Sequence, residues 1–190
     1  MIRSGDVLQN PVTRETLHIV RSASETGGEY VLVEARIEPG AAVAAKHLHP
    51  YQTEVFEVLE GRVGFEAGDE KLVAGPGETV VVEPGTAHRF WNAGDAPARF
   101  RCEVRPALEF EQLVATMFAL AADGKTNGKG LPNPLRLAVV AKHHFDDVRL
   151  PFPPAWIQRV GLAVGAPLGR LLGYRATYEG SAPSEGALAL

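Results

Sequence analysis

The sequence predicts a mainly β fold, a sandwich or barrel of short strands, followed by C-terminal helices. Three observations predict this fold. Alternating apolar and polar segments fill the first 105 residues, turn residues separate them at nearly regular spacing, and the apolar period lengthens after Pro106. Many short strands with regular turns are typical of sandwiches and barrels. With 190 residues, the chain is long enough for one such core and an appendage.

The alternation marks the individual strands. In residues 29–38, Val31, Val33 and Ile37 alternate with polar or charged residues, so one strand face is apolar. Residues 98–105 repeat the pattern, and Gly-rich turns separate the segments between them. The expected strands cover residues 16–22, 29–38, 53–60, 62–67, 71–74, 79–82, 88–92 and 98–105.

Helices are expected after Pro106. Apolar residues at three- and four-residue spacing, among them Leu113, Val114, Met117 and Phe118, predict an amphipathic helix over residues 109–122. Residues 124–134 are predicted to form an exposed loop, and residues 135–148 a second helix. We therefore expect a β-sandwich or barrel over residues 1–108, a helical extension over 109–180 that packs on this β domain or on a dimer partner, and a flexible tail over 181–190.

The apolar segment Trp156–Leu172 has three possible locations. It contains Arg159, Pro167 and Arg170, so it is a poor transmembrane span. It can pack on the barrel or the preceding helix, form a contact between two subunits, or lie on a membrane.

Composition narrows the class of partner. The net charge of −4, with both signs intermixed, offers no basic surface for nucleic acid. The first residues lack the apolar run of a secretory signal. The single cysteine, Cys102, excludes an internal disulfide and fits a reducing cytoplasm. Its place in an alternating strand predicts a buried, apolar role rather than a reactive thiol.

Four residues suggest a metal site. His47 and His49 are two residues apart, which places both imidazoles on one face of a strand. A turn follows, and Glu54 opens the next strand, so we expect a hairpin that brings the three together. His88 follows the Pro84-Gly85 turn and offers a fourth ligand. Imidazoles and a carboxylate are suitable ligands for a divalent transition metal.

The same residues resemble the two motifs of the cupins. The first motif joins a glycine, His-x-His, a glutamate and a second glycine; it is matched by Gly40, His47, His49, Glu54 and Gly61. The second is matched by Gly77, Gly85, His88 and Asn92. Two details depart from the usual pattern: the first spacer is one residue longer, and Glu83 replaces a proline, with Pro84 following it.

The resemblance covers residues 30–106 and implies a jelly-roll barrel. It also implies a metal-dependent enzyme with dioxygenase, isomerase or cyclase chemistry on a small organic molecule, and a homodimer. A non-catalytic metal-binding or small-molecule-binding module is the alternative. The ligand set does not distinguish Fe, Mn, Ni, Co and Zn.

Several other residues are assigned around this site. Phe56, Val58 and Phe90 share strand faces with the ligands and are expected to line an apolar pocket. Tyr51 and Gln52 lie in the turn beside the ligands, where they either contact a substrate or are simply exposed. The pair His143-His144 is expected at the surface rather than in a second metal site, because neighbouring helical residues point about 100° apart and no carboxylate has clear ligand spacing.

Overall fold

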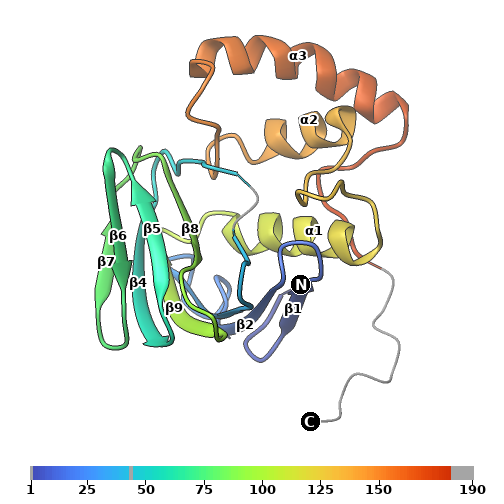
Figure 1. Cartoon of the computed structure of the whole chain (residues 1–190). Coiled ribbons are helices and arrows are strands. Elements are labelled where there is room, and N and C mark those ends of the chain that lie inside the picture. The colour runs from blue at the N-terminus through green and yellow to red at the C-terminus, as the bar shows by residue number, and fades with distance from the viewer. Residues whose placement is uncertain (1, 43–44, 181–190) are drawn as a thin grey trace.

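Two antiparallel β-sheets form the N-terminal part of the molecule (Figure 1). The structure is a computed structural model that describes residues 2–42 and 45–180. The strands are β1 (Val7–Asn10), β2 (Glu15–Arg21), β3 (Val31–Ile37), β4 (Thr53–Glu60), β5 (Val63–Ala67), β6 (Glu70–Ala74), β7 (Thr79–Val82), β8 (His88–Asn92) and β9 (Ala98–Arg105). One sheet has the order β1-β2-β3-β9-β4-β7 and the other β6-β5-β8.

The core lies between the two sheets, as the alternation predicts. In β3, Val31, Val33 and Ile37 are buried, while Glu34 faces outward and pairs with Arg99 on β9. Aromatic rings fill the space between the sheets, where Phe56 contacts Phe65, Phe90 and Phe100 at centroid distances of 5.2, 5.9 and 5.6 Å. The predicted mainly β class with C-terminal helices is confirmed.

A close backbone approach explains the motif residue Gly61. Its φ of +76° lies in the left-handed region, and a Cβ added there would be 2.8 Å from the Cα of Ala98. Any other residue would have a strained backbone at this φ, and its Cβ would collide with Ala98. The turn that leads from β4 into β5 therefore requires glycine.

Strand β1 was not predicted. It has four residues and pairs with β2 from Val7↔His18 to Asn10↔Glu15. Its sequence, VLQN, does not alternate between apolar and polar residues, and Val7 is 48% exposed. The strand exists because it pairs with β2, and the four residues of β1 do not reveal that pairing by themselves.

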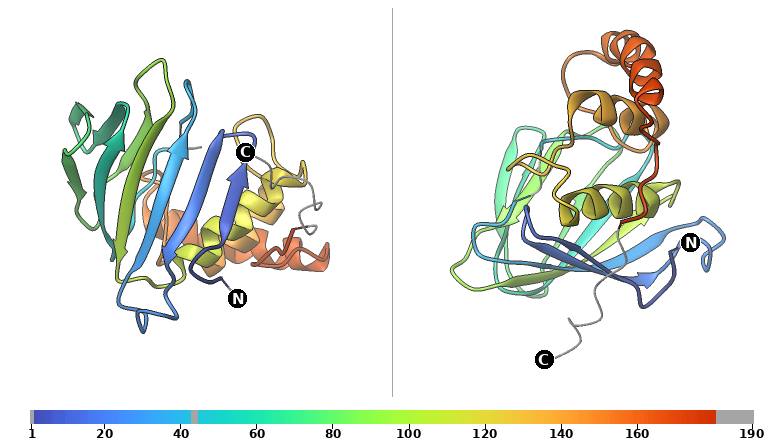
Figure 2. Two further views of the ribbon diagram at one scale, coloured as in Figure 1. Left: turned by 90° about the horizontal axis from the view of Figure 1, so that it is seen from below. Right: turned by 90° about the vertical axis from the view of Figure 1, so that its right-hand side faces the viewer.

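Three helices follow the sheets: α1 (Phe110–Ala122), α2 (Pro134–His143) and α3 (Ala155–Leu171). Helix α1 packs against β1 at the end of the larger sheet (Figure 2). Its buried face includes Leu113, Phe118 and Leu120, and the Glu111 carboxylate accepts a hydrogen bond from the Ala23 N–H at 2.9 Å.

Helix α2 ends five residues before its predicted end at Val148. Asn133 caps its start, accepting a hydrogen bond from the Arg136 N–H at 2.9 Å. The chain then leaves the helix and pairs with the segment before β4, where Leu48 and Arg149 exchange two backbone hydrogen bonds of 2.9 and 3.0 Å. This long-range pairing determines where the helix ends.

Helix α3 packs on α2 through small residues. A Cβ at Gly169 would lie 2.5 Å from the Leu135 carbonyl oxygen, and one at Gly165 would lie 3.0 Å from the Ala138 Cβ. The chain then returns to α1, where the Tyr178 N–H donates to the Thr116 Oγ1 at 3.3 Å. Among the described residues, no helix has the length and apolar character needed to cross a membrane. The flexible tail expected over 181–190 lies outside the described residues.

Candidate metal centre

His47 and His49 lie on an extended segment that pairs with β8, not on a hairpin with β4. His47 and His88 exchange backbone hydrogen bonds of 3.0 and 2.7 Å. Strand β4 instead pairs with β7 and β9. The predicted hairpin is therefore wrong, although its consequence holds, because the bridge to β8 brings the first two histidines to the third.

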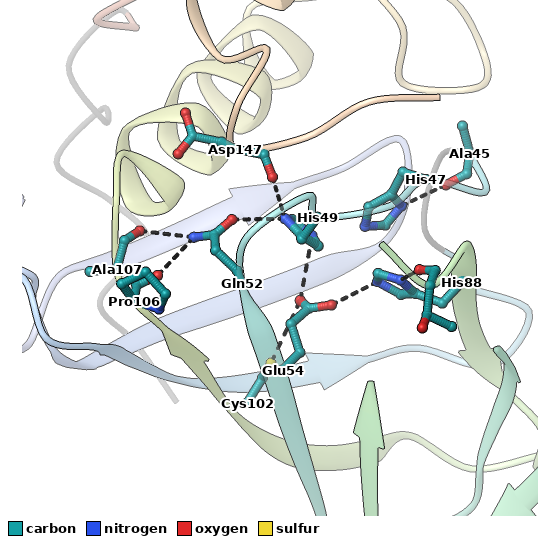
Figure 3. A network of polar contacts seen from close by, with 11 residues as sticks. Ala45, His47, His49, Gln52, Glu54, His88, Cys102, Pro106, Ala107 and Asp147 are labelled. Atoms are coloured by element: carbon teal, nitrogen blue, oxygen red, sulfur yellow. Dashed lines mark hydrogen bonds and ion pairs between the residues drawn. The ribbon is translucent and has the colours of Figure 1, made fainter. Parts of the chain in front are cut away.

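The four predicted ligand residues lie together near the start of β4 (Figure 3). One ring nitrogen from each of His47, His49 and His88 lies within 4.8 Å of the others. The Glu54 carboxylate lies beneath them, with Oε2 2.7 Å from the His88 Nε2 and Oε1 3.7 Å from the His49 Nε2. His49, Glu54 and His88 are buried, and His47 is partly exposed.

Backbone carbonyls orient all three imidazoles. The Nδ1 atom of His47 lies 2.9 Å from the Ala45 oxygen, that of His49 lies 2.6 Å from the Asp147 oxygen, and that of His88 lies 2.9 Å from the Thr86 oxygen. A carbonyl oxygen only accepts, so each Nδ1 carries the hydrogen. In the neutral rings, each Nε2 is then a free lone pair.

These lone pairs require a cation. The His49 Nε2 is buried and has no hydrogen-bond partner among the described residues. In the neutral state, the His88 Nε2 lone pair faces a carboxylate oxygen at 2.7 Å, so two acceptors meet unless a proton or a metal ion lies between them. The donor set therefore fits a divalent metal, and a carbonyl on the far nitrogen is the usual support for a metal-binding histidine.

The charges of the site are strongly coupled. Burial raises the pKa of Glu54, but the neighbouring His49 and His88 have the larger combined effect and lower this pKa to about 2. Burial, together with the neighbouring His88 and His49, lowers the pKa of His47 to about 4. Burial also lowers the pKa of His88, whereas the hydrogen bond and charge of Glu54 raise it, and the net pKa lies above 6.5. At neutral pH, the site thus holds an ionised carboxylate beside a neutral His47.

The two turn residues have different environments. Gln52 is buried, and its amide nitrogen donates to the carbonyl oxygens of Pro106 and Ala107, each at 3.0 Å. Its amide oxygen lies 3.0 Å from the His49 Nδ1, so Gln52 helps to orient the His49 ring through the nitrogen that points away from Glu54. Tyr51 is 59% exposed at the surface.

The residues expected to line a pocket lie in the core. Phe56 and Val58 are each 1% exposed, and Phe90 packs against Phe56 and Phe100. The structure therefore does not place Phe56 and Val58 beside an open cavity. Cys102 is buried next to Glu54, with its Sγ 4.0 Å from Oε1, and burial raises the pKa of the thiol well above its usual value. Its predicted buried role is confirmed.

Sequence reasoning missed two residues of the helical part that reach the site. The Asp147 carbonyl binds His49, and the Phe110 ring lies 5.9 Å from the His49 ring. A backbone carbonyl leaves no signal in a sequence, because every residue has one. Phe110 belongs to the apolar stripe of α1, which does not distinguish it from a core residue.

The pair His143-His144 is not entirely at the surface. His144 is fully buried, and its Nδ1 lies 2.9 Å from the Asp147 Oδ2; the His143 Nε2 lies 2.9 Å from the Glu109 Oε2. The expectation is wrong for His144, because the fold buries it beside Asp147, three residues further on, and Glu109, which lies far away in the chain. Together with Glu109, the two histidines form a second group of potential ligand atoms that lie within 4.8 Å of one another.

Comparisons with known proteins agree with the fold and the motifs. Residues 33–104 match the family model of the cupin domain. An uncharacterized protein of Methanocaldococcus jannaschii is 29% identical over 102 residues, which cover 53% of this chain and 77% of that protein. The oxidoreductase OpS7 of Beauveria bassiana is 33% identical over 93 residues, which cover 43% of this chain and 30% of the fungal protein. The chain therefore matches only a minor part of that relative.

A solved structure supports the same fold. A predicted oxalate decarboxylase of Thermotoga maritima superposes with a TM-score of 0.50 at 16% identity, covering 56% of this chain and 98% of the other. The matched segment 33–104 contains the three clustered histidines and Glu54. The chain thus contains a cupin domain.

Proposed function

We propose that the chain binds one divalent transition metal through His47, His49, Glu54 and His88. One observation carries this proposal: carbonyl oxygens hold the hydrogen on each Nδ1, so the remaining ring nitrogens and a buried carboxylate meet as acceptors. A metal ion would replace the proton that otherwise lies between His88 and Glu54.

The ligand set indicates what chemistry is available. Three imidazoles and one carboxylate leave one or two positions open on a five- or six-coordinate ion, and the set contains no thiolate, so Fe, Mn, Ni, Co and Zn all remain candidates. A bound ion would supply a Lewis acid that polarises an oxygen-bearing small molecule. Phe110 and the Asp147 segment shield His49 from water, and partly exposed His47 marks the side open to a ligand.

We further propose that the protein is a metal-dependent enzyme acting on a small organic molecule, with oxidoreductase chemistry of the dioxygenase type as the first candidate. Two relatives named as oxidoreductases, from Beauveria bassiana and Arthrobotrys oligospora, support this class at 33% identity over 93 residues and 32% identity over 95 residues. Isomerase or cyclase chemistry uses the same open positions. A non-catalytic binding module is the alternative.

Elemental analysis tests the metal site. Protein purified without chelator or nickel resin is expected to contain close to one ion per chain, and His49→Ala or His88→Ala to lose most of it. His18→Ala is the matched control, because His18 is an exposed histidine on β2. Absence of metal after incubation with Fe, Mn, Ni and Zn salts would refute the site.

Oxygen uptake tests the enzyme. Iron-loaded protein is screened against small enols, phenols and keto acids with an oxygen electrode. Uptake that depends on one compound and disappears in His88→Ala, but not in His18→Ala, supports dioxygenase chemistry. A compound that binds and is recovered unchanged, with no oxygen consumed, favours the binding module instead.

A further inference from the structure

The outward face of α3 is apolar, and its inward face is made of small residues. Trp156, Val160, Val164, Leu168 and Leu171 recur at three- and four-residue spacing and are 67, 62, 62, 49 and 84% exposed. The opposite side, which includes Gly165 and Gly169, packs on α2. The usual arrangement of a surface helix is thus reversed. Figures 1 and 2 show α3 as the outermost element, with α2 between it and the rest of the fold.

The segment before α3 extends this apolar face. Leu150 and Phe152 are 50 and 78% exposed. The Gln158 side chain holds the segment against the helix by donating to the carbonyl oxygens of Leu150 and Pro153 at 2.9 and 2.5 Å. Soluble monomers rarely expose apolar patches of this extent, and such patches indicate an interaction surface.

The charged residues of the segment that carries the patch are all of one sign. Residues 148–178 contain four arginines and no acidic residue, in a chain whose net charge is −4. Arg159 and Arg170 are eleven positions apart, about three helical turns, so both lie along the same border of the apolar stripe. Arg159 pairs with Asp146 at 3.6 Å, and Arg170 has no acidic partner among the described residues.

An anionic lipid surface fits these features better than a second copy of the chain. Two α3 helices packed antiparallel about a two-fold axis would bring their arginine borders to the same side, and the segment 148–178 offers no acidic residue to pair with them in either antiparallel or parallel packing. An apolar face bordered by arginine, with a tryptophan at one end, is typical of helices that lie in the interface of a bilayer. We propose that the outer face of α3 docks on a membrane surface rich in anionic phospholipid.

Vesicle flotation with the full-length chain tests the proposal. Vesicles with about one third phosphatidylglycerol are expected to bind at least ~10-fold more protein than pure phosphatidylcholine vesicles, and salt should weaken the binding. Trp156 supplies a direct probe, because its emission should shift to shorter wavelength on binding and Trp156→Phe should lose the shift. Arg170→Glu should reduce the preference for anionic vesicles.

A pair of double variants separates the α3 face from general surface hydrophobicity. Val160→Glu with Val164→Glu should abolish vesicle binding, whereas Val7→Glu with Val20→Glu, at exposed positions on β1 and β2, should leave it unchanged. No binding of the wild-type chain to anionic vesicles overturns the proposal. A wild-type dimer that does not bind vesicles, and that the α3 variant converts to a monomer, also overturns it and assigns the face to a subunit contact. An unshifted Trp156 emission overturns it even if the double variant fails to fold.

Discussion

Helices α1 and α3 both carry apolar side chains at helical spacing, and they differ in what lies against them. Helix α1 packs on β1, and the chain after α3 crosses it at Thr116, so Thr116 and Leu120 are fully buried. Helix α3 contacts α2 through glycines, and Val160 and Val164 are each 62% exposed. Periodicity thus identifies an apolar face, but it does not identify the surface that covers it.

The two helices also differ in their relation to the candidate metal centre. Helix α1 begins at Phe110, whose ring faces His49, and Gln52 bonds to the carbonyl oxygens just before this helix. Helix α3 supplies no residue to the site. Helix α1, whose apolar face is covered, therefore supports the ligand residues. Helix α3, whose apolar face is exposed, is free to bind a surface outside the chain.

Truncating a covered leucine should have the largest effect on stability. Leu120→Ala in α1 is expected to lower the free energy of unfolding by about 2–5 kcal/mol, because it leaves a cavity in a fully buried position. Val164→Ala in α3 should change it by less than about 0.5 kcal/mol. Urea denaturation measures both, and equal losses would contradict the contrast between the helices.

Alanine substitutions at two glycines of α3 should have opposite effects on stability, because one glycine lies on the side of the helix that packs on α2 and the other lies on the open side. Gly169→Ala is expected to cost about 1–3 kcal/mol, because the new Cβ would meet the Leu135 carbonyl oxygen at 2.5 Å. Gly161→Ala meets no atom within 4 Å and should stabilise the helix by up to about 1 kcal/mol. Thermal denaturation followed by circular dichroism compares them, and a neutral Gly169→Ala would mean that the two helices are not closely packed.

Gln52 should link the start of α1 to the metal site. Gln52→Ala removes two hydrogen bonds to the Pro106 and Ala107 carbonyl oxygens and the contact with His49. Metal affinity should fall about 10–100-fold, as for other residues that orient a ligand from behind. Competition with a coloured chelator measures this change. Exposed Tyr51→Ala is the control, and equal affinities in the two variants would exclude a positioning role for Gln52.

Acid should weaken metal binding, because protons compete with the metal ion for His88. We expect this effect to be the smallest of the four. Its folded-state pKa lies above 6.5, so the proton stabilises the metal-free protein below pH 6.5, and this contribution is lost as the pH rises through the folded-state pKa. A metal ligand must be neutral, so affinity should rise about 10-fold per pH unit below that pKa and level off above it. Titrations across this range check the slope; a flat profile would argue against His88 as a ligand.

Much of the site was predictable because its ligands form two compact motifs. His47, His49, Glu54 and His88 all converge, as their spacing indicates. The route differs from the prediction, because His47 pairs with His88 rather than within a hairpin. The three carbonyl partners of the imidazoles were not predictable, since backbone groups have no sequence identity.

The sequence by itself determined strands β2 to β9, helix α1, the start of α2 and the cluster of metal-binding residue types, because alternation, period and motif spacing are local properties. Only the tertiary structure decided that Asp147 reaches His49, that His144 is buried and that α2 ends at His143. Each depends on segments that are far apart in the chain. The same holds for α3, whose apolar pattern is local, but whose exposure follows from glycines that let it pack on α2 by its other side.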